Sequence, residues 1–336
     1  MVARSFPEYV VAPTVAWSIA QFMEFRRLRN LSVRTITRYT TDFRLWTAWR
    51  ERMGHSPFLP DITIEELRAY FTYLRDEHVP HSTNPHRQTF AQPGLKPYTI
   101  QGHWKLIHAA WVFWTDEELL TDRQMAFFAR GRIPGPKVPL EIRPTYDPVV
   151  VEALLAADGP KPRSVSVARD HAVILLLYDT GMRVSELCAL TDEAMNYAER
   201  RAKVRGKGEK HRYAFWTERT AAALEAYRAI RPGVVGGALF RSLGTGGRAR
   251  KRAGMAIGPG VIRDILERRA ARAAVTLPPS AVHALRHSFA HRFLDNGGDG
   301  LHLQQLLGHE SIVTTMRYVR ENPTALQRTY RRIFGE

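Results

Sequence analysis

Four short segments in the second half of the sequence carry side chains suited to chemistry on a phosphate. Those side chains are two arginines, a lysine, two histidines and a tyrosine: Arg183, Lys207, His283, Arg286, His309 and Tyr318. A guanidinium is a planar fork that grips phosphate oxygens, so Arg183 and Arg286 are candidates for stabilising phosphate charge. The titratable groups can move protons, and a tyrosine hydroxyl becomes a nucleophile once it is deprotonated. Together they suit phosphodiester transfer through a covalent tyrosine ester.

The spacing of these residues places them relative to local structure. His283 and Arg286 are three positions apart, so they face the same side of one helix. Lys207 is flanked by glycines, which predicts a turn from which the ammonium reaches into a groove as a proton donor. His309 follows a glycine at a helix junction, and Tyr318 comes nine residues later. Each segment is weak alone, because a helical histidine or tyrosine is more often structural; only the combination carries the hypothesis.

No cofactor and no metal are expected. His283, His287 and His291 could form a histidine face on one helix, but neither a carboxylate nor a cysteine completes a ligand set. The sequence also has no phosphate-cradling loop of the GxxxxGK[ST] type. Tyr330 is an alternative nucleophile, but Tyr318 is the one with the histidine nine residues upstream.

Composition excludes several classes of protein. The 336 residues include 49 Lys and Arg against 33 Asp and Glu, a formal net charge of +16, with 44% hydrophobic residues. One cysteine excludes a disulfide framework, and the longest aliphatic run, residues 172–177, is too short to cross a bilayer. No secretion signal is evident, so we expect a cytoplasmic protein without a membrane partner. The excess charge favours a nucleic acid, although the large share of arginine could also reflect coding bias.

The first part of the chain is predicted to be all-helical. Helices are expected over residues 14–29, 32–53, 63–77 and 98–114, with a loop over residues 79–97. Their aromatic residues recur at three- and four-residue steps, which is more typical of a core than of base-stacking platforms. Four prolines in residues 131–144 then predict an extended linker between two domains.

The second part is predicted to be mixed. Residues 202–216 alternate around a glycine turn and predict a short antiparallel hairpin. The expected helices cover residues 147–157, 166–179, 217–230, 259–274, 280–296, 301–307 and 311–320, and a last one starts at Pro323.

In this order and at these separations, the segments resemble the tyrosine recombinase (phage integrase) family, in the style of Xer-like and integron or transposon integrases. The resemblance implies a mainly α fold with a small antiparallel β-sheet. It implies a helical, SAM-like core-binding domain for DNA over residues 1–130, a linker over residues 131–144, and a catalytic domain with a tail helix over residues 145–336. One departure is Thr-Gly-Met-Arg183, where the family usually has leucine; this change conserves volume and should be silent.

The resemblance also implies a reaction. Tyr318 attacks the scissile phosphate and forms a 3′-phosphotyrosyl intermediate, which the hydroxyl of a partner strand then resolves. His283 is the expected general base and Lys207 the general acid, with transition-state charge stabilised by the remaining three residues: Arg183, Arg286 and His309. The expected partner is double-stranded DNA bearing a specific site. We expect a homo-tetramer on paired sites, associated with the nucleoid.

Two other functions stay open at this point. The same site could give a type IB-like topoisomerase, which religates a nick without strand exchange. A chain that binds DNA through its basic surface and catalyses no reaction would instead be a DNA-binding regulator. The complete set of six catalytic-type residues argues against the regulator.

Overall fold

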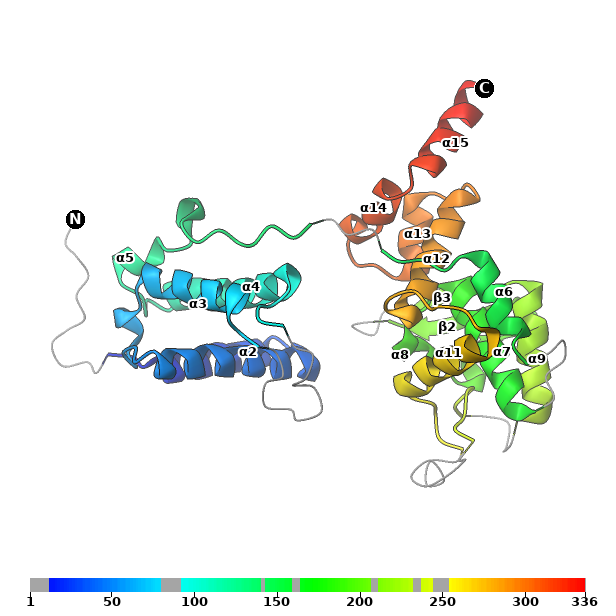
Figure 1. Cartoon of the computed structure of the whole chain (residues 1–336), viewed down its shortest axis with the longest axis horizontal. Coiled ribbons are helices and arrows are strands. Elements are labelled where there is room, and N and C mark those ends of the chain that lie inside the picture. The colour runs from blue at the N-terminus through cyan, green and yellow to red at the C-terminus, as the bar shows by residue number, and fades with distance from the viewer. Residues whose placement is uncertain are drawn as a thin grey trace. The chain divides into compact units, whose positions relative to one another are not determined.

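The computed structural model describes residues 12–79, 92–139, 143–158, 164–206, 211–231, 237–243 and 254–335. The chain divides into two compact units, Met1–Leu140 and Glu141–Glu336, and the division falls within the proline-rich range 131–144. Helices make up most of both units, and a three-stranded antiparallel sheet lies in the second (Figure 1). The predicted fold class, mainly α with a small antiparallel sheet, is confirmed. None of the helices in these residues is long and apolar enough to cross a bilayer.

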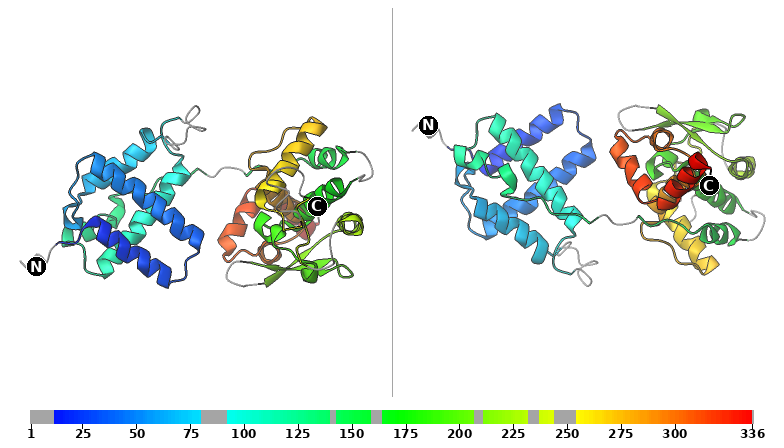
Figure 2. Two further views of the ribbon diagram at one scale, coloured as in Figure 1. Left: turned by 90° about the horizontal axis from the view of Figure 1, so that it is seen from below. Right: turned by 90° about the horizontal axis from the view of Figure 1, so that it is seen from above.

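In its described residues, the N-terminal unit has four long helices that cross one another (Figure 2). They are α1 (Val15–Leu28), α2 (Val33–Arg52), α3 (Ile64–Asp76) and α4 (Pro97–Asp116), with the short helices η1 (Leu59–Asp61), α5 (Asp122–Met125) and η3 (Ala129–Gly131) between or after them. Thr14, Ser32 and Thr63 cap the first three through side-chain oxygens that accept a backbone N–H. These starts are the ones that the sequence predicted.

Aromatic side chains form the core of this unit. Trp46, Trp114 and Tyr70 are completely buried, which confirms that the aromatic stripes are core. The indole of Trp114 donates to the carbonyl of Ser18, so α4 is tied to α1 by a buried polar contact as well. Trp17 and Tyr98 are exceptions, 48% and 74% exposed. The buried stripe of α1 runs along Val15, Ser18 and Phe22, beside Trp17.

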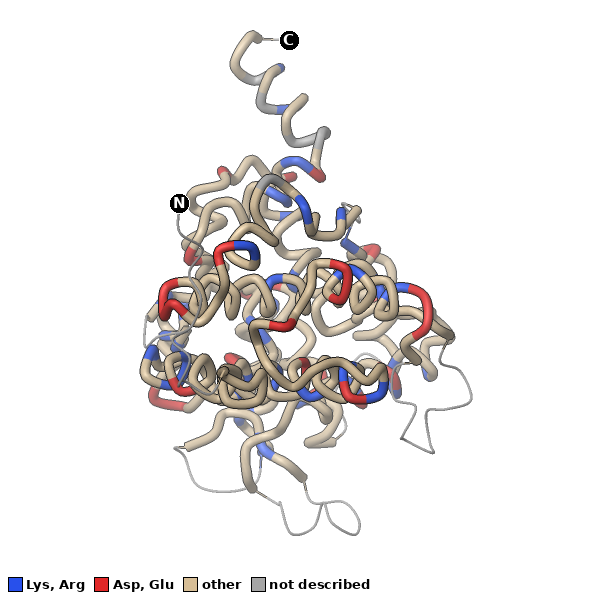
Figure 3. The backbone as a smooth tube through the Cα atoms, turned by 90° about the vertical axis from the view of Figure 1, so that its left-hand side faces the viewer, with Lys and Arg blue, Asp and Glu red and all other residues tan. Residues whose placement is uncertain are grey.

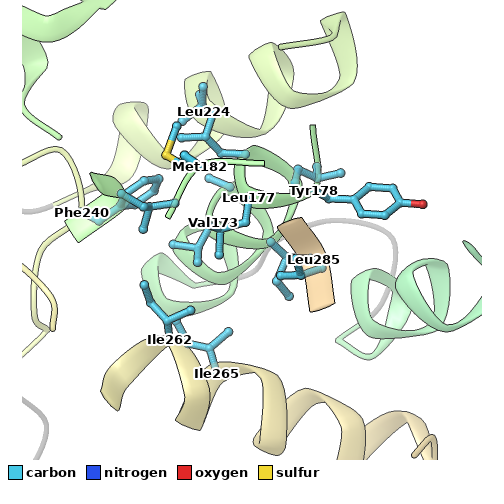
Figure 4. Packing of buried hydrophobic residues seen from close by; sticks show 14 of the residues in the cluster. Val173, Leu177, Tyr178, Met182, Leu224, Phe240, Ile262, Ile265 and Leu285 are labelled. Carbon is cyan, nitrogen blue, oxygen red and sulfur yellow. The ribbon is translucent and has the colours of Figure 1, made fainter. Parts of the chain in front are cut away.

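The second unit surrounds a buried helix. Its helices are α6 (Pro148–Ala156), α7 (Val165–Thr180), α8 (Val184–Cys188), η4 (Asp192–Ala194), α9 (Glu218–Ile230), α11 (Pro259–Ala273), α12 (Ala281–Asp295), α13 (Gly300–Leu307), α14 (Ile312–Arg320) and α15 (Pro323–Phe334). Figure 4 shows side chains of α9, α11 and α12 packed around α7. Val173 of α7 is completely buried there, as are Leu224, Ile262 and Leu285 from the surrounding helices. This core holds α7 and α12 in place, and both helices contribute to the candidate active site.

The sheet has the order β1 (Met195–Asn196), β2 (Arg201–Arg205), β3 (His211–Phe215). Strands β2 and β3 form the predicted hairpin, with Val204 opposite Arg212 and Arg205 opposite His211. The two-residue strand β1 and the short helix α8 were not predicted from the sequence, since neither is long enough to show a hydrophobic period.

Candidate active site

Arg286 is a deeply buried charge of the site. It lies on α12, is 6% exposed, and donates from Nη1 to the carbonyl of Gly181 at 2.6 Å. Its Nη2 donates to the carbonyl of Leu307 at 2.8 Å and to Nε2 of His309 at 3.0 Å. Burial, helped by the charge of Arg183, lowers the pKa of Arg286 to about 10, so the group stays cationic at neutral pH. The backbone therefore holds a desolvated positive charge in a fixed orientation.

Arg183 is positioned by a buried carboxylate. Its Nη1 lies 2.8 Å from Oε1 of Glu186, whose Oε2 accepts from the Arg183 backbone N–H at 2.7 Å and from Arg212 at 2.8 Å. Burial works to raise the pKa of Glu186, but Arg212 and Arg183 outweigh it and hold the pKa below its usual value. Arg183 also donates to the carbonyl of Gly308 at 3.3 Å. Its side chain keeps 38% exposure, so it can meet a ligand from solvent.

His309 links Arg286 to the helix of the tyrosine. An arginine can only donate, so Nε2 of His309 accepts from Arg286 and Nδ1 carries the hydrogen, which points at Oγ1 of Thr315 at 2.8 Å. Burial, with the charges of Arg286 and the nearby arginines, lowers the pKa of His309 to about 4. The imidazole is therefore neutral at pH 7. Its ring is stacked with that of Tyr318, with 6.3 Å between the ring centroids and 4° between the ring planes.

Tyr318 of α14 lies at the centre of this cluster and is 1% exposed. Its hydroxyl has two partners: Nη1 of Arg143 at 3.0 Å and Nδ1 of His287 at 2.9 Å. The guanidinium of Arg143 also lies over the phenol ring, 5.1 Å from its centroid, and His291 meets the ring edge-on. Both partners of the hydroxyl belong to the second unit.

Of the two remaining predicted site residues, one is exposed and the other lies outside the described residues. His283 is exposed on the first turn of α12, and no hydrogen bond joins it to Tyr318 among the described residues. Lys207 lies outside the described residues. The residue before it, Gly206, lines a cavity of about 920 Å³ together with residues of β3 and α13 and with His309.

The structure thus brings together four of the six predicted residues and adds three that the sequence did not assign to the site. The four are Arg183, Arg286, His309 and Tyr318; the three added residues are Arg143, Arg212 and His287. His287 was visible in the sequence as a further histidine one turn after His283, but the residues alone could not show which of the two faces the tyrosine.

The arrangement combines a phenol, a neutral imidazole on its oxygen, and fixed cations nearby. Such a site suits a reaction in which a phenol loses a proton while negative charge grows on a phosphate. In the described part of the chain, no group of three or more histidine, cysteine or acidic side chains is arranged to hold a metal ion.

Comparisons with known proteins decide the family. A profile of the phage integrase family matches residues 146–325. The tyrosine recombinase XerD of Caulobacter vibrioides is 31% identical over 313 residues, which are 90% of this chain and 91% of that protein. The chain belongs to the phage integrase family. It is a tyrosine recombinase, an enzyme of site-specific recombination, as its sequence predicted.

Other relatives agree with this family. The tyrosine recombinase XerC of Myxococcus xanthus is 35% identical over 206 residues, 59% of this chain and 65% of that protein. Among solved structures, the Tn1549 transposon integrase in complex with transposon right end DNA matches with a TM-score of 0.66 and 18% identity. That match covers 95% of this chain and 100% of the other. A lambda integrase dimer bound to a core site matches with a TM-score of 0.63 and 16% identity. That match covers 91% of this tyrosine recombinase and 95% of the other chain. At these identities the structures support the fold.

Proposed function

We propose that this tyrosine recombinase cuts and rejoins double-stranded DNA at a specific site through a 3′-phosphotyrosyl intermediate, with Tyr318 as the nucleophile. The observation that carries the proposal is the burial of Tyr318, whose hydroxyl accepts from Arg143, in one cluster with the buried and oriented Arg286. Because the ester conserves the energy of the broken bond, rejoining requires no ATP, and in this proposal the arginines supply the charge stabilisation that a metal would otherwise give.

The proposed roles follow from the geometry of each group. Arg183, Arg286 and His309 stabilise charge on the pentacoordinate phosphate, because their orientations are fixed before substrate arrives. Lys207 is the proposed general acid for the leaving 5′-oxygen, and the cavity lined by Gly206 and His309 supports this role. His283 is the proposed general base; it is exposed on the first turn of α12, where it can meet a bound substrate.

DNA is the proposed substrate, bound by both units. The Tn1549 and lambda integrase structures were determined on DNA, which supports this partner for a chain of the same fold. Lysine and arginine positions recur along the backbone, interspersed with acidic ones (Figure 3). Arg34 and Arg38 are exposed on α2, one turn apart, and are proposed phosphate contacts of the N-terminal core-binding domain. Four further basic residues that could follow the DNA backbone lie outside the described residues: Arg248, Arg250, Lys251 and Arg252.

The active assembly is proposed to be a homo-tetramer on two paired sites. Helix α15 supports this, because its apolar side chains Leu326, Tyr330, Ile333 and Phe334 are 53–70% exposed. A helix with an uncovered apolar face is suited to dock on a neighbouring copy. The proposed place of action is the cytoplasm, on nucleoid DNA.

The decisive experiment traps the covalent intermediate. Cells expressing the tyrosine recombinase or its Tyr318→Phe variant are lysed in detergent, and the DNA ends that remain bound to protein are sequenced. We expect ends attached through a 3′-phosphate at one recurring sequence, and none with the variant. Adducts that persist in Tyr318→Phe would overturn the assignment of the nucleophile, and Tyr330→Phe serves as the matched control.

The topoisomerase alternative is separated by the products. The recovered site is placed twice on one supercoiled plasmid, and the purified protein is added. Recombination gives circles of new size, whereas a topoisomerase gives only relaxed plasmid of the original size. DNA binding without any covalent adduct would instead favour the regulator.

A further inference from the structure

A chain of four polar side chains crosses the N-terminal unit and ends at an exposed arginine. Arg38 of α2 donates from Nε to Oδ2 of Asp42, one turn later on the same helix, across 3.3 Å. The other carboxylate oxygen of Asp42 lies 3.6 Å from Nε2 of His103 on α4. Nδ1 of His103 lies 3.3 Å from the hydroxyl of Tyr70 on α3. Three helices therefore contribute to the placement of one arginine side chain.

The hydrogen-bond directions along this chain agree with one another. A carboxylate only accepts, so Nε2 of His103 carries the hydrogen that faces Asp42. Burial lowers the pKa of His103 against the opposing charge of Asp42, so the ring is neutral and Nδ1 accepts from Tyr70. Tyr70 and His103 are 0% and 4% exposed. An apolar pair would fill this core without hydrogen bonds, so the polar pair indicates a role in holding Asp42.

The guanidinium of Arg38 lies against α4 at a glycine. A Cβ atom at Gly102 would come within 2.0 Å of Nη2 and 3.2 Å of Cζ of Arg38. A residue larger than glycine would therefore displace the arginine from this position. The side chain is thus held from two directions, by the carboxylate of Asp42 and by the backbone of α4.

This placement leaves the outer edge of the guanidinium open. The side chain of Arg38 is 54% exposed, and in the described part of the chain neither Nη1 nor Nη2 has a hydrogen-bond acceptor. Tyr98 and Lys105, one turn to either side of Gly102 on α4, are also exposed. A pair of coplanar N–H donors held in one orientation matches N7 and O6 of guanine in the major groove of DNA.

A contact with a phosphate does not require this support. A phosphate is attracted by charge and accepts hydrogen bonds from many directions, so a flexible basic side chain is sufficient. Arg34, one turn before Arg38, is exposed and has no hydrogen bond or ion pair with any described residue. Asp42 also reduces the net charge beside Arg38, which weakens attraction to a phosphate more than hydrogen bonding to an uncharged base. The two arginines of α2 are therefore suited to different contacts.

We infer that Arg38 is a specificity-determining residue that donates two hydrogen bonds to N7 and O6 of one guanine in the recombination site, and that Asp42 is its positioning residue. The inference rests on the proposed function and refines one part of it: Arg34 remains a phosphate contact, whereas Arg38 contacts a base. Gly102 belongs to the same arrangement, because it leaves the space that Arg38 occupies.

Selection by binding tests this inference without depending on cleavage. Duplexes of random sequence are bound to the purified full chain, recovered by gel shift and sequenced, for the wild type, Arg38→Ala and Arg34→Ala. We expect the wild type to enrich a site with one guanine that Arg38→Ala no longer selects, while the other positions keep their preferences. Arg34→Ala should enrich the same site as the wild type but bind all duplexes more weakly, with a smaller dependence on salt.

A duplex with 7-deazaguanine at the selected position gives an independent measurement. This base lacks the N7 acceptor and keeps its Watson–Crick pairing. The wild type should bind it about tenfold more weakly than the guanine duplex, whereas Arg38→Ala should bind both alike. If Arg38→Ala instead weakens binding to every sequence equally and lowers the salt dependence, Arg38 is a phosphate contact and the inference is wrong.

Two further variants test the positioning of Arg38. In Gly102→Ala the added methyl group overlaps Nη2, and only the end of a flexible side chain has to shift, so the helix should stay folded. Asp42→Asn sets an amide group between two donors in place of the carboxylate. We expect both variants to lose most of the preference for the guanine, with melting temperatures close to that of the wild type. An unchanged preference in both would overturn the role of Asp42 and Gly102.

The outcomes for the two proposals are distinct. A wild type that enriches no sequence contradicts the site-specific binding of the proposed function together with this inference. A wild type that enriches the same site as a folded Arg38→Ala contradicts only this inference. Thermal unfolding shows whether each variant is folded; if Arg38→Ala is unfolded, Gly102→Ala decides.

Discussion

At the scale of single residues, the site depends on one buried cation, Arg286, whose partners are backbone carbonyls and a neutral histidine. Arg286 bonds the carbonyls of Gly181 and Leu307, which end α7 and α13, so one side chain ties together three helices. Carbonyl groups satisfy its hydrogens without neutralising its charge. The full positive charge therefore remains for a phosphate, which a carboxylate partner would have reduced.

Replacing Arg286 by lysine should separate charge from shape. A lysine ammonium is a point charge and cannot reach partners that Arg286 contacts through two different nitrogens. We expect Arg286→Lys to form the covalent adduct about 10²–10³-fold more slowly. Orphaned carbonyls should also lower the free energy of unfolding by about 1–3 kcal/mol. Single-turnover cleavage and urea unfolding measure these two effects.

The matched control is Arg292→Lys on the same helix. Arg292 donates to the carbonyl of Tyr178 at 3.2 Å and lies over that ring, away from the tyrosine of the site. Its cleavage rate should stay within about threefold of wild type. Equal rates for Arg286→Lys and wild type would show that charge alone is sufficient at this position.

The neutral state of His309 gives a testable dependence of stability on pH. Its pKa is about 4 in the folded protein, lowered from 6.5 by burial and then by Arg286, Arg183, Arg143 and Arg212. Between pH 6.5 and 4 the unfolded chain binds a proton that the folded chain does not. Its contribution to stability is therefore complete above pH 6.5 and is lost as the pH falls, with a slope of at most about 1.4 kcal/mol per pH unit.

Urea unfolding of wild type and His309→Asn at pH 7.5, 6 and 5 measures this contribution. The wild-type free energy of unfolding should fall more steeply over that range than that of the variant. His287 adds a similar dependence of its own, because its pKa is also lowered, to about 3. If the two proteins lose stability in parallel, the folded environment of His309 does not keep it neutral.

At the scale of elements, two left-handed glycines end the helices that carry the carbonyl partners of Arg286. Gly181 has φ +57° and ends α7, and Gly308 has φ +63° and ends α13. A methyl group on Gly181 would come within 2.4 Å of Phe289 and 3.0 Å of Leu307. The turn at Gly181 therefore requires glycine for both its backbone angle and its close packing.

Comparing alanine substitutions at Gly181 and Gly254 separates the requirement for the backbone angle from the requirement for close packing. Gly254 has φ +79° with nothing within 4 Å of the added methyl group, so Gly254→Ala should cost only the backbone strain, about 1–2 kcal/mol. Gly181→Ala should lose a further 1–3 kcal/mol or so from overpacking and also slow cleavage. Thermal and urea unfolding of both variants test this; equal losses would mean that Phe289 moves aside freely.

Local signals in the sequence predicted most of the elements but not how the helices cross. Caps such as Ser32 and Thr63, and the glycine turn of the hairpin, act within a few residues, so the sequence shows them directly. The contact of Arg143 with Tyr318 spans 175 positions and depends on where α14 lies against the segment before α6. His283 and His287 share α12, so only the way α14 packs against α12 decides which of them meets the tyrosine.

At the scale of the whole molecule, the tail helix links the chemistry of one copy to the assembly of several. Its start is fixed within its own unit, because Asn322 bonds Asp295 of α12 at 2.9 Å. Beyond that point α15 extends away from α12, α13 and α14 (Figure 1), with an exposed apolar face. Such a face either docks on a neighbouring copy or folds back on its own unit, and the two outcomes differ in what they stabilise.

An acidic substitution on that face distinguishes the two outcomes. Leu326 is 70% exposed, and Leu326→Asp would place a charge in any apolar contact that α15 makes. If α15 docks between copies, the variant still forms the covalent adduct on a single site but loses paired-site complexes and recombination in native gels and two-site assays. Gln327→Asp adds the same charge at the next position, also exposed, and should assemble normally. A lower free energy of unfolding for Leu326→Asp, with paired-site assembly intact, would instead mean that the helix packs on its own unit.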